Sequence, residues 1–563
     1  MKHNKLFIIL FCFIIWGCSI TSLNKNLFAA NTANTKPSIT YLILAKNVFK
    51  RVINAYGLIG KYTPRLKIDS DTDQIFARVF EDGTISISEK AVVFCYSGVS
   101  EDIGNSRFAF VVAHEIAHLA NCDFDRINQM QSYSNPSNAI RTYIRNQMEF
   151  LADRNALIYS AIAGYQISYL RNNSGHFIKQ WVNLTGHTGI GHPPPAQRID
   201  LLMKQIAEVA KRIRHFDIAV RLYQIGQYTE SLRFFESFRK YFPCHAVLNN
   251  IALIHYQKAM MELKKKDACK FKLSLKLNTY SCAHQNLKRQ ENKEFIDNID
   301  NAKKIFSEAL IKDKKHIPSI INYTSALIIE AIESKEPSHG NYSIAKGLLM
   351  NAKNIEPDNL LIQNNLVIAT YLASNSSSDD YTATIADMEK LSKNDKSFAT
   401  AYYNLGRLQL IHKNNTNALA YQEAWKKYIT LEPNGPYAEM VRNELKIPKP
   451  KNTKPGFLVN NGSLEPGRAN QKQIEYLNTI QSQLIDMGKI YFYYQTNELN
   501  ALSIGTLSKW ILFVEYPGNN VKFQYNLTKT ANVFKKPSGV TTYVYDSFAC
   551  DVDGGTIVKK IFF

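Results

Sequence analysis

Two histidines stand four residues apart around a glutamate in "FAFVVAHEIAHLANCDFD", the stretch from Phe108 to Asp125. On a helix, positions four apart share one face, so His114 and His118 can present ring nitrogens to one metal ion. Glu115 is rotated by about a hundred degrees from His114, beside the ion. A carboxylate placed there suits a general base for zinc-bound water, whose pKa the metal lowers towards neutrality. The spacing therefore predicts one Zn²⁺ per chain and hydrolytic chemistry.

The residues around this motif predict a buried helix from about Arg107 to Ala120. Its apolar positions are Phe108, Val111, Val112, Ile116 and Leu119. Ionisable side chains in such a helix must pair with a partner or bind a metal. The alternative is that the two histidines only make hydrogen bonds inside a core.

A catalytic zinc site needs a third protein ligand and an open position. The best candidate is Glu149 in "NQMEFLADRNAL", on a second helix predicted from about Ala139 to Gly164. Asp153 lies one turn further on and could orient a ligand histidine. Ala152 between them is small enough for close helix packing. Two acids four apart are also typical of a solvated helix face, which is the competing interpretation.

Three motifs together resemble those of the zinc metallopeptidases that include the CAAX prenyl endopeptidases and the bacterial heat-shock membrane proteases. They are "HEIAH", "EFLAD" and "GHPPPAQRIDLL", and the resemblance covers roughly residues 40 to 205. It implies that Glu149 completes the ligand set and that polypeptides are the substrates. The chain departs from the family pattern at Asn146, where arginine is frequent, and in "NCDFD" after the motif helix.

The third motif leaves the role of His192 open. The side chain could stabilise an oxyanion, occupy the open metal position as a gate, or only cap the helix that Pro193 begins. Arg198 is expected to pair with an acid rather than to contact substrate. The strand "TISIS", residues Thr84 to Ser88, could accept an extended substrate if it lies at a sheet edge.

The pattern of the chain predicts a multidomain, mostly α protein. Residues 38–215 form an α+β, zincin-like metalloprotease domain, and residues 216–445 form an α-solenoid of tetratricopeptide-like helix pairs. Recurring small and aromatic positions carry the repeat: Ser231, Phe235 and Phe238; Ala302, Phe306 and Ala309; Ala345, Leu349 and Ala352. First-helix fragments "LNNIA", "QNNLV" and "YNLG" share a register, and an insertion falls around Lys264 to Asp297. The order resembles that of the periplasmic β-barrel assembly-enhancing proteases, soluble members of that family.

A Pro/Lys linker at 446–456 precedes a β-rich domain of unknown function at 457–563. We expect a helix near Gln471 to Met487 in this domain. "WILFVEYPGNNVKFQYNL" is expected to form two strands joined at Pro517 to Asn520, and "TTYVYDSF" and "GTIVKKIFF" to add two more.

The first 30 residues resemble an export signal, with lysines before a twelve-residue apolar run. Cleavage near Ala30 and a lipid anchor on Cys18 remain alternatives, and both predict a bacterial periplasmic protein. Eight cysteines are too few for a disulfide framework, although Cys269 and Cys282 could bond. The net charge of +20 comes from scattered lysine clusters without a nucleic-acid motif. It predicts a basic surface and no specific nucleic acid, and leaves peripheral contact with a membrane open.

These features lead to two functional hypotheses. The first is a zinc endopeptidase for exported or misfolded proteins, in which Glu115 is the base and the solenoid recruits clients or an outer-membrane protein assembly machinery. The second is a non-catalytic periplasmic chaperone or scaffold with a vestigial protease domain. An intact set of His114, Glu115, His118 and Glu149 favours the enzyme.

Overall fold

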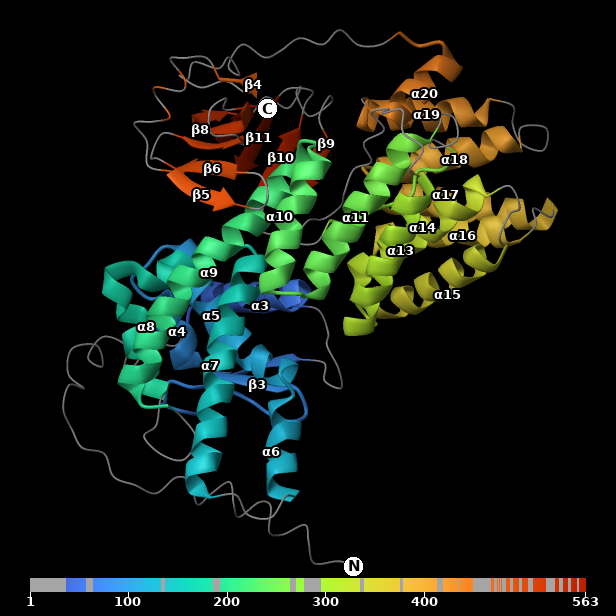
Figure 1. Cartoon of the computed structure of the whole chain (residues 1–563). Coiled ribbons are helices and arrows are strands. Elements are labelled where there is room, and N and C mark those ends of the chain that lie inside the picture. The colour runs from blue at the N-terminus through green and yellow to red at the C-terminus, as the bar shows by residue number, and fades with distance from the viewer. Residues whose placement is uncertain are drawn as a thin grey trace, which may run out of the picture.

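The structure is a computed structural model of the 563-residue chain. Its described residues are 37–56, 64–132, 137–185, 193–263, 270–277, 295–334, 339–374, 378–412, 419–433 and 435–448, and mainly strands from 467 to 562. The chain is mostly α and multidomain, with a small mixed sheet near the N-terminus and an antiparallel sheet near the C-terminus (Figure 1). Among the described residues, no helix has the length and apolarity needed to cross a membrane.

The small sheet has the strand order β1-β3-β2, where β1 is Arg65–Asp69, β2 is Ala77–Val79 and β3 is Thr84–Ser88. The tight turn at Asp82 and Gly83 joins β2 to β3, and Gly83 has a φ of 84°, which favours glycine. The central strand β3 pairs in parallel with β1 and antiparallel with β2. The hypothesis that Thr84 to Ser88 receives a substrate as an edge strand is therefore wrong, because both of its edges are used.

Helices surround this sheet and share one core. Helix α3 (Ile39–Tyr56) begins the domain, and α4 (Glu89–Tyr96), the buried α5 (Glu101–Ala120), α6 (Asp123–Ser132) and α7 (Asn138–Ile162) follow β3. A short 3₁₀ helix at Ile167–Arg171 leads into α8 (Asn172–Thr185). Helix α5 packs against both α7 and β2. The motif helix is thus held between a second helix and the sheet.

Helix α9 (Pro195–Gln224) leads from this domain to the rest of the chain. Its N-terminal part packs on α7 and α8, and its C-terminal part packs on α10 (Tyr228–Tyr241). The helix starts with Pro195 rather than Pro193, which agrees with the preference of proline for the first helical turn. One continuous helix therefore runs through residues 215 and 216, where the sequence predicts a domain boundary.

A TPR-like array of helices follows on the right of Figure 1. Its members are α11 (His245–Glu262), α13 (Phe295–Lys312), α14 (Ile317–Glu333), α15 (His339–Ile355), α16 (Leu360–Ala373), α17 (Ser378–Asn394), α18 (Ala399–Ile411), α19 (Ala420–Leu431) and α20 (Pro436–Leu445). Each helix packs on the next. The small positions Ala302, Ala345 and Ala352 are fully buried, as helix-pair packing requires.

The C-terminal sheet has the order β5-β6-β7-β8-β12-β11-β10-β9, and β4 also pairs with β8. The strands are β4 (Gly467–Arg468), β5 (Ser482–Asp486), β6 (Ile490–Gln495), β7 (Asn500–Ile504), β8 (Trp510–Lys522), β9 (Asn532–Lys535), β10 (Thr541–Val544), β11 (Phe548–Asp553) and β12 (Thr556–Phe562). The helix expected near Gln471 to Met487 is confirmed only in its first part, because Gln473, Glu475 and Leu477 are helical whereas Ser482–Asp486 form β5. The expected hairpin around Pro517 is wrong, because these residues belong to one long strand, β8, that pairs with β7 and β12.

Candidate metal centre

Helix α5 brings His114 and His118 to one face, as the motif predicts. The two Nε2 atoms lie 3.1 Å apart, with the rings roughly perpendicular to each other. The helix is enclosed by the core, so His114 is buried and the His118 side chain keeps 15% of its exposure. Both rings are therefore largely shielded from solvent, the His118 ring slightly less than the His114 ring.

Glu149 on α7 completes the group. Its Oε2 lies 3.6 Å from His114 Nε2, and its Oε1 lies 3.6 Å from His118 Nε2. One ligand atom from each of the three side chains lies within 4.8 Å of the others. His114, His118 and Glu149 thus form a buried group that could hold a metal ion. The solvated helix face that competed for Glu149 and Asp153 is ruled out, because both carboxylates are buried.

The far side of each ring faces a buried carboxylate. His114 Nδ1 lies 2.9 Å from Asp153 Oδ1, and His118 Nδ1 lies 2.8 Å from Asp123 Oδ2. A carboxylate at this position holds the proton on Nδ1 and leaves a lone pair on Nε2. Two Nε2 lone pairs that face each other at this distance repel, so either a proton or a metal ion between them is favoured. Nitrogen ligands of a tetrahedral Zn²⁺, at about 2.0–2.1 Å each, lie roughly 3.3 Å apart, so the donor set fits zinc.

No sequence motif predicts a role for Asp123. Helix α5 ends at Ala120 with Asn121 as its C-cap, and Cys122 adopts a left-handed φ of 55° before α6 begins at Asp123. This conformation is uncommon for a residue other than glycine, asparagine or aspartate and costs roughly 1–2 kcal/mol. It turns the chain so that the Asp123 carboxylate returns to His118. The stretch "NCDFD", which departs from the family pattern, thus contains a carboxylate that contacts a histidine of the pair.

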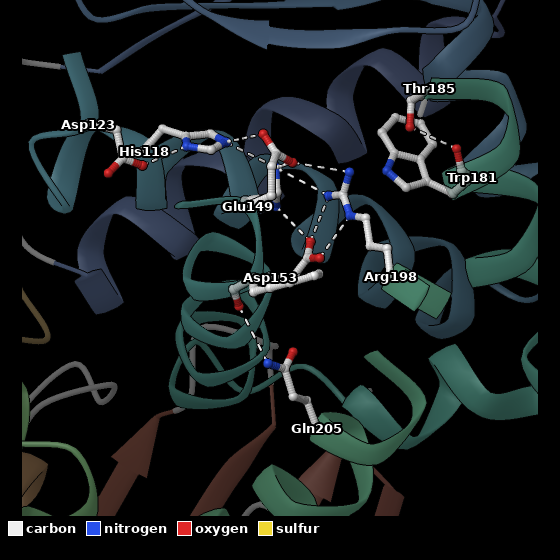
Figure 2. Close-up of polar contacts among 10 residues, drawn as sticks. His118, Asp123, Glu149, Asp153, Trp181, Thr185, Arg198 and Gln205 are labelled. Carbon is white, nitrogen blue, oxygen red and sulfur yellow. Dashed lines mark hydrogen bonds and ion pairs between the residues drawn. The ribbon is translucent and has the colours of Figure 1, made fainter. Parts of the chain in front are cut away.

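Arg198 enters the site from the first turn of α9. Figure 2 shows its guanidinium between the carboxylates of Asp153 and Glu149. Its Nε and Nη2 each donate to Asp153 at 2.8 Å, and Nη1 lies 3.1 Å from Glu149 Oε2. The expectation that Arg198 pairs with an acid is confirmed by these contacts. The arginine holds both carboxylates of α7 and fixes the start of α9 at the site.

The charges of the site favour a cation. Burial lowers the pKa of His114, but the contacts with Asp153 and Glu149 outweigh it and raise that pKa to about 10. Burial raises the pKa of Asp153, yet Arg198 and His114 bring it below its usual value. An imidazole that binds a proton so tightly is surrounded by negative charge. A divalent ion at the Nε2 pair would satisfy the same charge.

Glu115 is buried beside the group and is not part of it. Burial raises the pKa of its carboxyl, and the charges of His114 and His118 lower it to a lesser extent. A carboxylate with a raised pKa accepts a proton more readily near neutral pH. The position and the direction of the shift suit the base that the motif predicts.

Two other features bear on the site. His192 lies outside the described residues, so all three interpretations of its role stay predictions. A cavity of about 640 Å³ is lined by Arg51, Arg214, Arg221, Glu515 and other residues near the junction with the C-terminal sheet. None of the metal-centre residues lines it. The cavity therefore belongs to the junction and not to the candidate metal centre.

Comparison with known proteins leaves the family open. No protein-family model matches the chain, and no curated protein matches it. Among solved structures, the chain is similar to the crystal structure of the P58(IPK) TPR domain at 2.5 Å, with 10% identity, 62% of this chain and 94% of that chain covered, and a TM-score of 0.14. The TPR-like arrangement is evident in this chain's own helices, each of which packs on the next. The resemblance to zinc metallopeptidases stays a prediction.

Proposed function

We propose that this chain is a zinc-dependent endopeptidase that acts on exported or misfolded proteins. The observation that supports this most is the pair of histidine Nε2 atoms beside Glu149, each ring backed by a buried carboxylate. In this proposal His114, His118 and Glu149 are the ligands, and Asp153 orients His114. A purely structural histidine pair would have no need for a third donor at 3.6 Å from both rings.

Each residue of the site has a separate role in the proposed hydrolysis. A bound zinc ion would activate water and polarise the peptide carbonyl. Glu115 takes the proton of the attacking water and delivers it to the departing amine. Arg198 keeps Glu149 and Asp153 in position throughout. Because β3 is paired on both sides, an extended client would pair with an edge strand, β1 or β2; of the two, β2 is the one that packs closely on α5.

The remaining parts of the proposal rest on the sequence. The helix-pair solenoid recruits polypeptide clients or an outer-membrane protein assembly machinery, since such arrays serve as binding surfaces for other proteins. The apolar N-terminal segment, which lies outside the described residues, directs the chain to the bacterial periplasm, with or without a lipid on Cys18. The three shared motifs support membership of the zincin-like metallopeptidases.

Metal content and proteolysis together test the proposal. We expect purified protein to contain about one zinc per chain and to cleave unfolded casein, and a chelator should abolish cleavage until zinc is added back. Zinc-loaded, folded protein that leaves unfolded casein intact would contradict the proposal. That result would favour the alternative, a non-catalytic chaperone or scaffold with a vestigial protease domain.

A further inference from the structure

A short segment of the chain, Lys270–Leu277, runs in extended form along the solenoid and is bound through its main chain. The N–H groups of Lys272, Ser274 and Lys276 donate to the side-chain oxygens of Asn404, Asn365 and Asn322 at 2.8, 2.7 and 2.8 Å. Each acceptor is a buried asparagine. Every second residue of the segment is thus held by one asparagine.

The same asparagines also bind the carbonyl groups. The side-chain nitrogens of Asn404, Asn365 and Asn322 donate to the carbonyls of Lys272, Ser274 and Lys276 at 2.9, 3.0 and 2.8 Å. A side-chain amide that accepts from N–H and donates to C=O of one residue replaces the peptide group of a neighbouring strand. These hydrogen bonds involve only main-chain groups of the segment, so they do not depend on which side chains it carries.

The asparagines come from alternate helices of the array: Asn249 from α11, Asn322 from α14, Asn365 from α16 and Asn404 from α18. We call this set the asparagine face. The segment runs against the order of the helices, since its later residues contact the earlier helices. Asn249 adds a second bond to the carbonyl of Lys276. The repeated first-helix asparagines in "LNNIA", "QNNLV" and "YNLG", together with Asn322, therefore form one continuous binding surface.

The side chains of the segment alternate as those of a β-strand do. Phe271, Leu273, Leu275 and Leu277 are each at most 3% exposed. Between them, Lys272 reaches Glu432 and the hydroxyl of Tyr428, and its ammonium lies 5.1 Å from the centre of the Tyr428 ring. The surface therefore selects alternating apolar residues and one basic residue, a pattern typical of amphipathic strands.

The chain does not need this segment to join its helices. Helices α11 and α13 pack directly on each other, yet residues 263–294 lie between them. Two antiparallel helices need a connection of only about 2–8 residues. If the insertion leaves the asparagine face, its four apolar side chains leave the hydrophobic core, but the direct packing of α11 on α13 does not depend on them as a connection.

We propose that the asparagine face is a binding site for an extended, strand-forming segment of another polypeptide, and that Lys270–Leu277 occupies it until such a segment displaces it. The proposal deepens the recruitment role in the proposed function and does not depend on the metal centre. A tethered segment competes at an effective concentration on the order of mM. Only clients that offer several such strands, or a better match, displace it.

The test measures binding of a fluorescent peptide with the sequence of residues 270–279 to the full chain. Fluorescence anisotropy gives the affinity, and Glu115→Gln in every protein prevents cleavage of the probe. Two variants, which we call open variants, are designed so that the tethered segment no longer occupies the asparagine face. One carries Leu273→Asp with Leu275→Asp, and the other has residues 270–277 replaced by Gly and Ser. We expect each open variant to bind the peptide at least about tenfold more tightly than the unaltered chain does.

Matched controls distinguish main-chain recognition from nonspecific hydrophobic binding. In an open variant, Asn365→Ala should weaken peptide binding at least about tenfold, whereas Asn351→Ala, at an exposed position on α15, should leave it unchanged. N-methylation of the peptide at Ser274 removes a bonded N–H and should weaken binding, while N-methylation at Leu273 should do so far less.

Two results would overturn the proposal. One is a folded open variant, judged by a native circular dichroism spectrum, that binds the peptide no better than the unaltered chain. The other result comes from a second experiment, which is used if neither open variant folds. Hydrogen exchange of residues 270–277 in the unaltered chain is then measured with and without about 1 mM peptide, a concentration comparable to the effective concentration of the tethered segment. Faster exchange supports displacement, and unchanged exchange means that the segment is a permanent part of the solenoid.

Discussion

The Nε2 atoms of His114 and His118 lie 3.1 Å apart, while their Nδ1 atoms face two different carboxylates. Asp153 backs the first ring from α7, and Asp123 backs the second from the start of α6. Each carboxylate fixes the tautomer and the direction of one ring. Metal affinity at this site should therefore depend on residues that never contact the ion, as well as on the ligands themselves.

Glu115→Gln should separate metal binding from catalysis. Glutamine keeps the size of the side chain but cannot take a proton, so we expect zinc content to stay near one per chain while casein cleavage falls at least about a hundredfold. Glu101→Gln, at an exposed position on the same helix, is the matched control and should retain full activity. Turnover of the Glu115 variant close to that of the unaltered chain would exclude Glu115 as the base.

Glu149→Ala and His118→Ala should lower bound zinc directly, because each removes a donor from the group. Metal content of the purified variants, determined by atomic emission, measures this. Full occupancy in Glu149→Ala would remove that residue from the ligand set.

Asp123→Asn should weaken zinc binding by about 10- to 100-fold, although Asp123 is not a ligand. The amide no longer holds the proton on His118 Nδ1 as a carboxylate does. Asp125→Asn, two residues further along α6, has no such contact with the histidines and should leave affinity unchanged. Competition with a chromogenic chelator gives both affinities, and equal values for the two variants would show that Asp123 does not orient His118.

The parts of the site that the sequence predicts are those governed by local geometry. Helix periodicity alone places His114 and His118 on one face, and the same rule places Glu149 and Asp153 one turn apart. Asp123 could not be predicted, because its contact with His118 depends on the left-handed conformation of Cys122. Nothing in the composition of "NCDFD" requires that turn.

Strand pairing and the solenoid surface illustrate the same limit. The alternation in "TISIS" predicts a strand but not its central place between β1 and β2. Pro517 to Asn520 resembles a turn, yet β12 pairs with β8 on both sides of it, up to Pro517 and again from Val521, so β8 continues through an irregularity in the register. The insertion after α11 is visible in the sequence, whereas its position along Asn322, Asn365 and Asn404 depends on the stacking of several repeats. Such long-range relations have no local sequence signal.

Arg221→Ala should separate the C-terminal sheet from α9. Arg221 donates to Glu515 on β8 at 2.8 Å and to Asp551 on β11 at 2.9 Å, and all three are buried. Removing the arginine leaves two buried carboxylates without this partner, which costs about 3–5 kcal/mol. We expect faster hydrogen exchange in β8 and β11. Arg212→Ala, which removes an exposed pair with Glu208 on the same helix, should change exchange little.

Low pH should speed hydrogen exchange in β8, as Arg221→Ala should. Burial raises the pKa of Glu515, but the charges of Arg221 and Lys559 outweigh it, so the pKa lies below its ordinary value of 4.5. The stability that Glu515 contributes is therefore complete above about pH 4.5 and is lost as the pH falls through the lower folded value. Exchange in β8 should rise over that range in the unaltered chain and much less in Arg221→Ala. Equal rises would contradict this role of the ion pair.

The solenoid should lose stability at a milder pH because of His245 and His316. The two rings are buried in contact, with centroids 4.4 Å apart, near the starts of α11 and α14. Burial, with a smaller effect from Lys312, lowers the pKa of His245 to about 3. Burial and the charge of His245 also lower the pKa of His316 well below its usual value. Both histidines therefore stay neutral in the folded chain at pH values where the unfolded chain takes up protons.

Stability should accordingly fall as the pH drops below about 6.5, by about 1.4 kcal/mol per pH unit for each histidine. Hydrogen exchange of α11 and α14 at pH 7.5 and pH 5.0, corrected for intrinsic rates, measures the loss. His245→Phe keeps the aromatic contact without the titration and should reduce the difference between the two pH values, whereas the exposed His176→Gln should not. An unchanged difference in His245→Phe would rule out the histidine pair as its cause. Because α11 and α14 carry Asn249 and Asn322, acid that loosens these helices should also release the segment bound on the asparagine face.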